Sequence, residues 1–142
     1  MTTQMHDLTV PGVRLAYPPR NEYGEQILDI IGPGGITVGL VSYRNVNRRR
    51  AQAELGIELL EPYRGQGYGP QAIRLLLREL FDNRGMQRVY LRVREYNQQA
   101  RRAYVKVGFR YIRTVRWPLI GVVRYLVMEI TKGEFTWQPG PG

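Results

Sequence analysis

The stretch that decides the fold reads Arg64-Gly65-Gln66-Gly67-Tyr68-Gly69. It follows an apolar, strand-like segment at residues 55–60 and leads directly into an amphipathic helix that we expect to begin at Pro70. A glycine-rich turn at a helix N-terminus can direct several unpaired backbone N–H groups at an anion, and the helix dipole favours negative charge at the same place. The pattern therefore predicts a phosphate-binding turn.

Two better-known phosphate-binding motifs do not fit this stretch. A P-loop ends in Gly-Lys-Ser or Gly-Lys-Thr, and the chain contains no such triplet. A Rossmann turn carries its glycines in the order G-x-G-x-x-G, whereas Gly65, Gly67 and Gly69 stand at alternate positions. Taken by itself, the stretch is also compatible with an ordinary turn that binds nothing, so the surrounding sequence has to decide.

The composition is typical of one globular domain, because the chain has 142 residues and a hydrophobic content of 43%. We therefore expect a single domain over residues 1–142, with a flexible arm at residues 1–19 and a frayed tail at residues 133–142. The apolar runs are too short to cross a bilayer, and no secretory segment is recognisable. A cytoplasmic location is expected.

The residue types exclude several kinds of chemistry. The chain has no cysteine, which removes disulfides, thiolate metal sites and acyl-cysteine mechanisms. The single histidine, His6, lies in the polar N-terminal arm, which argues against a Ser-His-Asp relay and against a metal site. The formal net charge of +9 implies attraction to anions. These observations favour a transfer reaction in which the enzyme mainly positions two reactants.

The hydrophobic periodicity predicts an α/β (α+β) fold with an antiparallel N-terminal meander, a parallel strand–helix–strand crossover, a second helix and two closing antiparallel strands. Polar or glycine-rich turns are expected at residues 32–35 and 45–50 and at Trp117-Pro118. The predicted elements are strands at residues 13–16, 26–31, 36–43, 51–60, 89–93, 109–115 and 122–130, a helix from Pro70 to a stop at Asn83-Arg84-Gly85, and a helix from the N-cap Asn97 to Val107.

With these elements in order, the chain resembles the GNAT superfamily of acetyl-CoA-dependent N-acetyltransferases. The resemblance covers about residues 51–130 and rests on three motifs at the right separation. They are Arg64-x-x-Gly67-x-Gly69 after a strand, the strand at residues 88–93, and Asn97-x-x-Ala100-x-x-x-Tyr104-x-Lys106-x-Gly108-Phe109. The details look most similar to the branch that acetylates ribosomal protein N-termini and polyamines. The resemblance implies a GNAT-like mixed central sheet.

The resemblance also implies a site for acetyl-CoA or CoA as co-substrate. Backbone N–H groups of the glycine-rich loop hold the pyrophosphate, which small residues allow to approach closely, and freed backbone of the third strand pairs with the pantetheine arm. One departure is Pro70, which lacks the N–H that the residue after the last glycine commonly offers. The implied cofactor-binding residues are Ile57, Leu59, Arg64, Gly65, Gln66, Gly67, Tyr68, Gly69, Asn97 and Tyr104.

The implied chemistry is direct attack of a primary amine on the acetyl thioester, without a covalent enzyme intermediate and without a metal. Tyr104 matches the tyrosine that relatives place near the CoA sulfur, where a hydroxyl can protonate the leaving thiolate; a core tyrosine is the alternative. Glu54 is the first candidate for the base that deprotonates the amine, and Glu58 is the second. A backbone N–H near Leu59 is a candidate oxyanion donor.

The sequence leaves the identity of the acceptor amine open. The segment before the third strand is short, which suggests an open cleft suited to a protein N-terminus. The alternatives are a polyamine, for which Glu22, Glu25, Asp29 and Glu54 are candidate partners, a small-molecule amine, or a non-catalytic module that only binds CoA. Nucleic acid is not favoured as a partner, since the aromatic residues and arginines do not form an RNA-binding motif. A homodimer is expected from the family.

Overall fold

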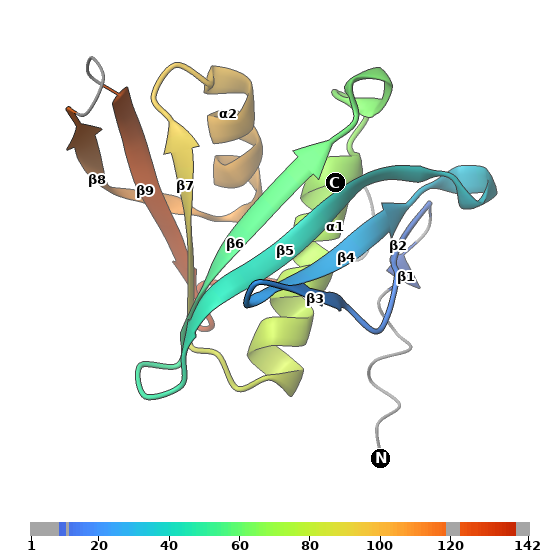
Figure 1. The fold of residues 1–142 in the computed structure, drawn as a ribbon, viewed down its shortest axis with the longest axis horizontal. Coiled ribbons are helices and arrows are strands. Elements are labelled where there is room, and N and C mark those ends of the chain that lie inside the picture. Colours follow the sequence, from blue (N-terminus) through green and yellow to red (C-terminus); the bar gives the residue numbers. More distant parts are fainter. Residues whose placement is uncertain (1–8, 11, 119–122, 139–142) are drawn as a thin grey trace.

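The computed structural model describes residues 9–10, 12–118 and 123–138 of the chain, which form a sheet backed by two helices (Figure 1). The strands are β1 (Thr9–Val10), β2 (Val13–Leu15), β3 (Arg20–Glu22), β4 (Glu25–Ile31), β5 (Thr37–Asn47), β6 (Gln52–Leu59), β7 (Arg88–Arg94), β8 (Arg110–Trp117) and β9 (Val123–Thr131). The helices are α1 (Tyr68–Arg78) and α2 (Gln98–Val107), with 3-10 turns η2 (Pro33–Gly35) and η3 (Glu61–Tyr63) and a π-helical turn η4 (Glu79–Asn83).

The sheet confirms the predicted α+β topology. Its strands follow the order β1-β2-β4-β5-β6-β7-β9-β8, and β3 pairs with β4 outside this path. β6 and β7 are parallel and are joined through α1, while the other described pairs are antiparallel. β1 and β3 were not predicted, and β5 continues to Asn47 beyond its predicted end at residue 43. The cross-strand partners of β5 in β6 account for the extra length.

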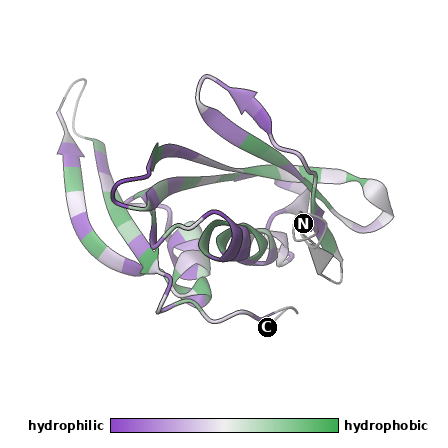
Figure 2. Cartoon of the chain, turned by 90° about the horizontal axis from the view of Figure 1, so that it is seen from below, coloured by the Kyte–Doolittle hydropathy of each residue, from purple (hydrophilic) through white to green (hydrophobic). Residues whose placement is uncertain are grey.

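Both helices cover the same face of the sheet (Figure 2). Apolar residues such as Leu76 of α1 and Leu80 of η4 pack with Leu55 and Leu91 of the sheet in one core, where each is at most 2% exposed. Strand residues alternate between the two faces, so the polar residues between these core positions lie on the opposite side. We call that side the helix-free face.

α1 begins earlier than predicted. Its N-cap is Gly67, with φ of 88°, so Pro70 is the third helical residue and not the first. The first N–H groups of a helix have no acceptor inside the helix, so a proline at this position removes no helical hydrogen bond. None of the described helices is long and apolar enough to cross a membrane.

The described residues near both ends of the chain pack against the rest of the fold. Within the segment expected to be a flexible arm, the predicted strand at residues 13–16 is present as β2, which pairs with β4 and buries Val13 and Leu15 in the core. In the tail, the ring of Phe135 lies 5.6 Å from that of Phe81, and the Arg78 guanidinium lies 3.8 Å from the Trp137 ring centroid. The sequence led us to expect a frayed tail over residues 133–142, and in its described part these aromatic side chains pack against α1 and η4. Residues 1–8, 11, 119–122 and 139–142, on which parts of these expectations fall, lie outside the described residues.

The centre of the sheet opens where β6 and β7 diverge (Figure 1). Their parallel ladder covers only the pairs Gln52–Arg88, Ala53–Val89 and Glu54–Tyr90. After Glu54 the ladder ends, although β6 runs on to Leu59 and β7 to Arg94. Backbone groups in the second half of β6 therefore face a gap and not a neighbouring strand.

Candidate active site

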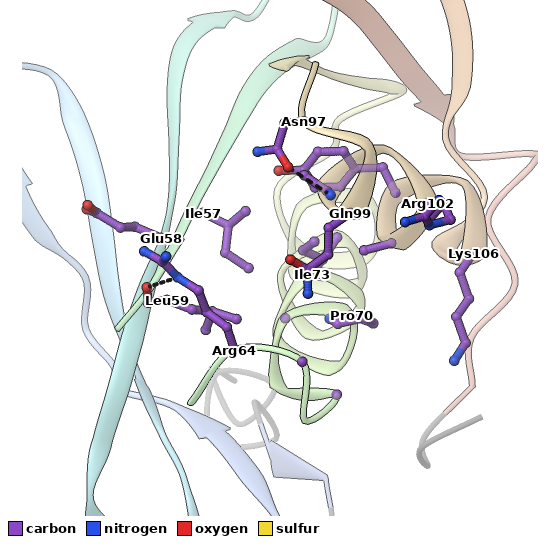
Figure 3. Close-up of a pocket in the computed structure, with 16 residues that line it drawn as sticks. Ile57, Glu58, Leu59, Arg64, Pro70, Ile73, Asn97, Gln99, Arg102 and Lys106 are labelled. Carbon is purple, nitrogen blue, oxygen red and sulfur yellow. Dashed lines mark hydrogen bonds between the residues drawn. The ribbon is translucent and has the colours of Figure 1, made fainter. Parts of the chain in front are cut away.

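A groove of about 580 Å³ lies where the end of β6, the start of α1 and one side of α2 meet (Figure 3). Most of the residues predicted for the site come together here. The predicted residues that line the groove are Ile57, Leu59, Arg64, Gly65, Gly67, Gly69, Asn97 and Tyr104, with Glu58 and Pro70 beside them. Gln66 and Tyr68 belong to the same loop but are not among the lining residues.

The loop presents unpaired backbone donors. Gly65 and Gly67 have φ of 74° and 88°, a left-handed conformation that favours glycine. Within the described chain, no amide of residues 65–69 donates to an acceptor, and the first bond of α1 runs from the Gln71 amide to the Gly67 carbonyl. A Cβ added to Gly67 meets nothing within 4 Å, so the space beside the loop is open. The donor set fits a diphosphate, which needs several convergent N–H groups.

The backbone of Ile57 and Leu59 faces the gap between β6 and β7. The Leu60 amide donates to the Val38 carbonyl at 2.9 Å. Because hydrogen-bonded and non-hydrogen-bonded pairs alternate in an antiparallel ladder, Ile57 and Leu59 direct their backbone groups away from β5. Nε of Arg64 donates to the Leu59 carbonyl at 3.1 Å, so this oxygen already has a partner (Figure 3). The remaining groups can pair with an extended ligand.

Tyr104 lies on α2, lines the groove and is 9% exposed. Its ring packs edge-on against Phe109, with centroids 6.0 Å apart. Burial raises the pKa of the Tyr104 hydroxyl above its usual 10.0. A phenol in this setting stays protonated at neutral pH, as a proton donor must.

The raised pKa of Tyr104 leads to a pH prediction. The Tyr104 hydroxyl is protonated below its pKa, so a raised pKa means that this proton is lost only at higher pH. We expect kcat at saturating substrates to show no fall between about pH 8 and 10, the range below the ordinary tyrosine value. A pH profile of kcat measures this directly, and a basic limb near pH 8 would show that another group supplies the proton.

Asn97 caps α2 with the side chain that was expected to contact CoA. Its Oδ1 accepts a hydrogen bond from the Ala100 amide at 3.2 Å, as the sequence predicted for an N-cap. The oxygen is therefore used within the chain. The side-chain amide nitrogen points away from the helix and is the atom available to a ligand (Figure 3).

Glu54, the first candidate for the base, lies outside the groove. Its side chain is 1% exposed, and its oxygens accept hydrogen bonds from Asn45 at 2.7 Å, Arg92 at 2.8 Å and Arg44 at 3.3 Å. A carboxylate occupied by three donors and shielded from the groove is badly placed to take a proton from an amine. Sequence spacing could not reveal this, because the donors come from β5 and β7.

Glu58, the second candidate, is better placed. It is exposed, borders the groove, and forms no ion pair with any residue that the structure describes. Figure 3 shows its side chain on the side of β6 away from α2, that is, toward the helix-free face.

Several groove residues were missed by the sequence reasoning. They share one side of α2 or the start of α1, and they are Ile73, Gln99, Ala100, Arg102, Ala103 and Lys106. Their spacing of three and four along α2 marks a single helical face, which was the available signal. Arg102 and Lys106 give this wall of the groove a positive charge.

The chain belongs to the GNAT acetyltransferase family. Residues 13–110 match the family model described as an acetyltransferase (GNAT) domain. The protein is thus an acetyltransferase of the acetyl-CoA-using N-acetyltransferase class. Comparison with curated proteins finds no match.

Solved structures support the same fold. The spermidine N-acetyltransferase SpeG from Vibrio cholerae, in complex with CoA and spermine, aligns with a TM-score of 0.72 and 21% identity over 79% of this chain and 68% of that chain. A dodecameric structure of spermidine N-acetyltransferase from the same organism aligns with a TM-score of 0.71 and 21% identity over 79% of this chain and 67% of that chain. At this identity the likeness shows the fold alone.

Proposed function

We propose that the protein transfers the acetyl group of acetyl-CoA to a primary amine within a ternary complex, with CoA bound in the groove. The observation that carries the proposal is the set of unpaired amides at residues 65–69 beside a groove that Tyr104 also lines. Convergent amides at a helix N-terminus bind a pyrophosphate. Arg102 and Lys106 on the facing wall supply charge for the other phosphate of CoA.

Each residue of the site has a proposed role. Ile57 and the Leu59 amide pair with the pantetheine arm, and the amide nitrogen of Asn97 contacts it from α2. When bound, acetyl-CoA supplies an activated acyl group. Tyr104 holds a proton for the departing sulfur, and Glu58, not Glu54, accepts a proton from the amine directly or through water. The Leu59 amide is also a candidate donor for the developing oxyanion.

The acceptor class has two candidates. The names of the SpeG neighbours favour a polyamine over the protein N-terminus that we predicted from the sequence. Because likeness at this identity carries the fold only, the choice has to rest on the charges around the gap between β6 and β7.

The proposed function is tested by thiol release. The protein is mixed with acetyl-CoA and, in separate reactions, with N-terminal peptides, spermidine or an aminoglycoside, and free CoA is measured with a thiol reagent. The chain has no cysteine, so the reagent reports only CoA. Release that depends on an amine is expected. Tight CoA binding without release for any amine would instead support a non-catalytic binding module.

A matched glycine pair tests the loop. Gly67→Ala and Gly24→Ala each place a side chain at a left-handed position, with φ of 88° and 83° and nothing within 4 Å of the new Cβ. Both should lose about 1–2 kcal/mol of stability through backbone strain. We expect only Gly67→Ala to weaken acetyl-CoA binding, by about tenfold, because a tilted loop loses charge-assisted hydrogen bonds of about 1.5–3 kcal/mol each. Calorimetric titration measures the affinity.

Gly24 lies in the turn between β3 and β4 and serves as the control. Equal affinities of the two variants for acetyl-CoA would contradict the role of the loop.

We also propose a homodimer, as expected from the family. Light scattering of the purified protein tests this, and a monomer at micromolar concentration would reject it.

A further inference from the structure

The two strands that border the gap present opposite charges to the helix-free face. Buried Leu55 of β6 and Leu91 of β7 point to the helices, so alternate residues point the other way. On β6 these residues are Gly56, which has no side chain, and the exposed Glu58. On β7 they are Arg92 and Arg94, both exposed. One wall of the gap is thus acidic and the other is basic.

The other acids near this face are already neutralised. Arg20 lies 2.8 Å from Asp29 and 3.6 Å from Glu22. Arg44 lies 2.8 Å from Glu25 and 3.3 Å from Glu54, so it pairs with both carboxylates. Hydrogen bonds from Ser42 and from Arg44 lower the pKa of the Glu25 carboxyl. Every acid that the sequence offered to a polyamine is therefore paired with an arginine.

Positive charge beside the gap is not neutralised in the same way. Arg94 faces Tyr125 of β9 across the ladder, and Arg113 of β8 faces Val127, in the same row as Arg92. Arg94 and Arg113 are exposed, and neither forms an ion pair within the residues that the structure describes. Nε of Arg92 donates a hydrogen bond to Glu54, and the Arg92 guanidinium lies over the Tyr125 ring, 5.6 Å from its centroid. The surface from β7 to β8 is cationic around two apolar or aromatic residues.

The acceptor has to reach the gap across this surface. The groove for CoA lies on the helix side of β6, so a thioester in the gap is covered from that side by CoA itself. An amine can therefore approach it only from the helix-free face. There the amine meets Glu58 on one side of the gap, and Arg94 and then Arg113 lie on the other side. The further ammonium groups of a polyamine are repelled by these arginines, whereas carboxylates pair with them.

We propose that the acceptor is a peptide whose α-amine is followed by acidic residues, with Arg94 and Arg113 as the residues that determine this specificity. The inference rests on the proposed acetyltransferase function. Neighbouring strands are about 4.8 Å apart, so β8 lies about 10 Å from β7 across β9. An extended peptide spans that distance in about three residues, which places the acidic side chains at the second to fourth positions.

The test compares two peptides and two enzymes at saturating acetyl-CoA. One peptide carries Asp at its second to fourth positions and the other carries Asn there, and spermidine is a third acceptor. We expect kcat/KM to be about tenfold higher for the Asp peptide, and Arg94→Ala to remove this advantage while leaving the Asn peptide unchanged. Arg113→Ala should act in the same direction. Arg49→Ala, an exposed arginine in the turn between β5 and β6, is the control and should change neither value.

The outcomes are distinct. Loss of the Asp preference in Arg94→Ala, but not in Arg49→Ala, supports the proposal, since the variant and the peptide change are then energetically coupled. Equal use of both peptides by the unmodified enzyme, or a higher kcat/KM for spermidine than for the Asp peptide, overturns it while the proposed function stands. Acetyl-CoA binding without thiol release for any acceptor ends both. In each assay, an unchanged acetyl-CoA affinity of the arginine variants shows that the groove is intact.

Discussion

Replacing Tyr104 with phenylalanine should lower kcat about 100-fold, the lower end of what a positioned acid contributes, while acetyl-CoA affinity is unchanged. The phenylalanine ring keeps the edge-on packing against Phe109. The hydroxyl donates to no residue that the structure describes, so its removal breaks no internal hydrogen bond. The loss is then confined to the step in which the sulfur leaves. Steady-state kinetics and calorimetric titration separate the two quantities.

Tyr111 provides the control for this variant. It is 56% exposed on β8, and its hydroxyl bonds to Thr114 at 2.9 Å, away from the groove. Tyr111→Phe should leave kcat unaltered. Unchanged turnover in Tyr104→Phe would remove Tyr104 from the chemistry and leave it as a core tyrosine.

Replacing Glu54 with alanine should destabilise the fold by about 3 kcal/mol, the lower end of the range for breaking a buried ion pair. The lower end applies because Arg44 and Arg92 are partly exposed, with side chains 31% and 48% accessible, and can be solvated after the change. The loss would appear as a lower urea midpoint with an unchanged slope. Glu54 thus ties β4, β5 and β7 together through its arginines.

Glu22→Ala is the matched control, because it removes an acid from a solvent-exposed pair with Arg20 and should cost less than about 1 kcal/mol. Glu54→Gln distinguishes structure from catalysis. It removes the charge but keeps the shape, and we expect kcat to be retained at temperatures where the variant is folded. A folded Glu54→Gln enzyme without turnover would restore Glu54 as the base and contradict the role given to Glu58.

Local sequence signals were sufficient for much of the fold. The alternation of Val89, Leu91 and Val93 with polar residues predicted β7, and the Asn97 cap and Gly108 stop predicted both ends of α2. These signals work because they reflect the periodicity and the capping chemistry of single elements. The packing of Phe135 and Trp137 escaped prediction, since nothing in the tail indicates which helix it meets.

The features of the site can also be separated into those set by local sequence and those set by tertiary packing. The sequence by itself determined the glycine-rich loop at the start of α1 and the presence of Tyr104 on α2, because backbone conformation at glycine and helical phase are local properties. Only the tertiary structure separated the two glutamates, which lie four residues apart on the same face of one strand and look alike in sequence. Arg44 and Arg92 reach Glu54 from neighbouring strands, whereas Glu58 lies beyond the end of the β6–β7 ladder. Which charges meet across a sheet depends on strand register and divergence, and these are set by packing between segments that are distant in the chain.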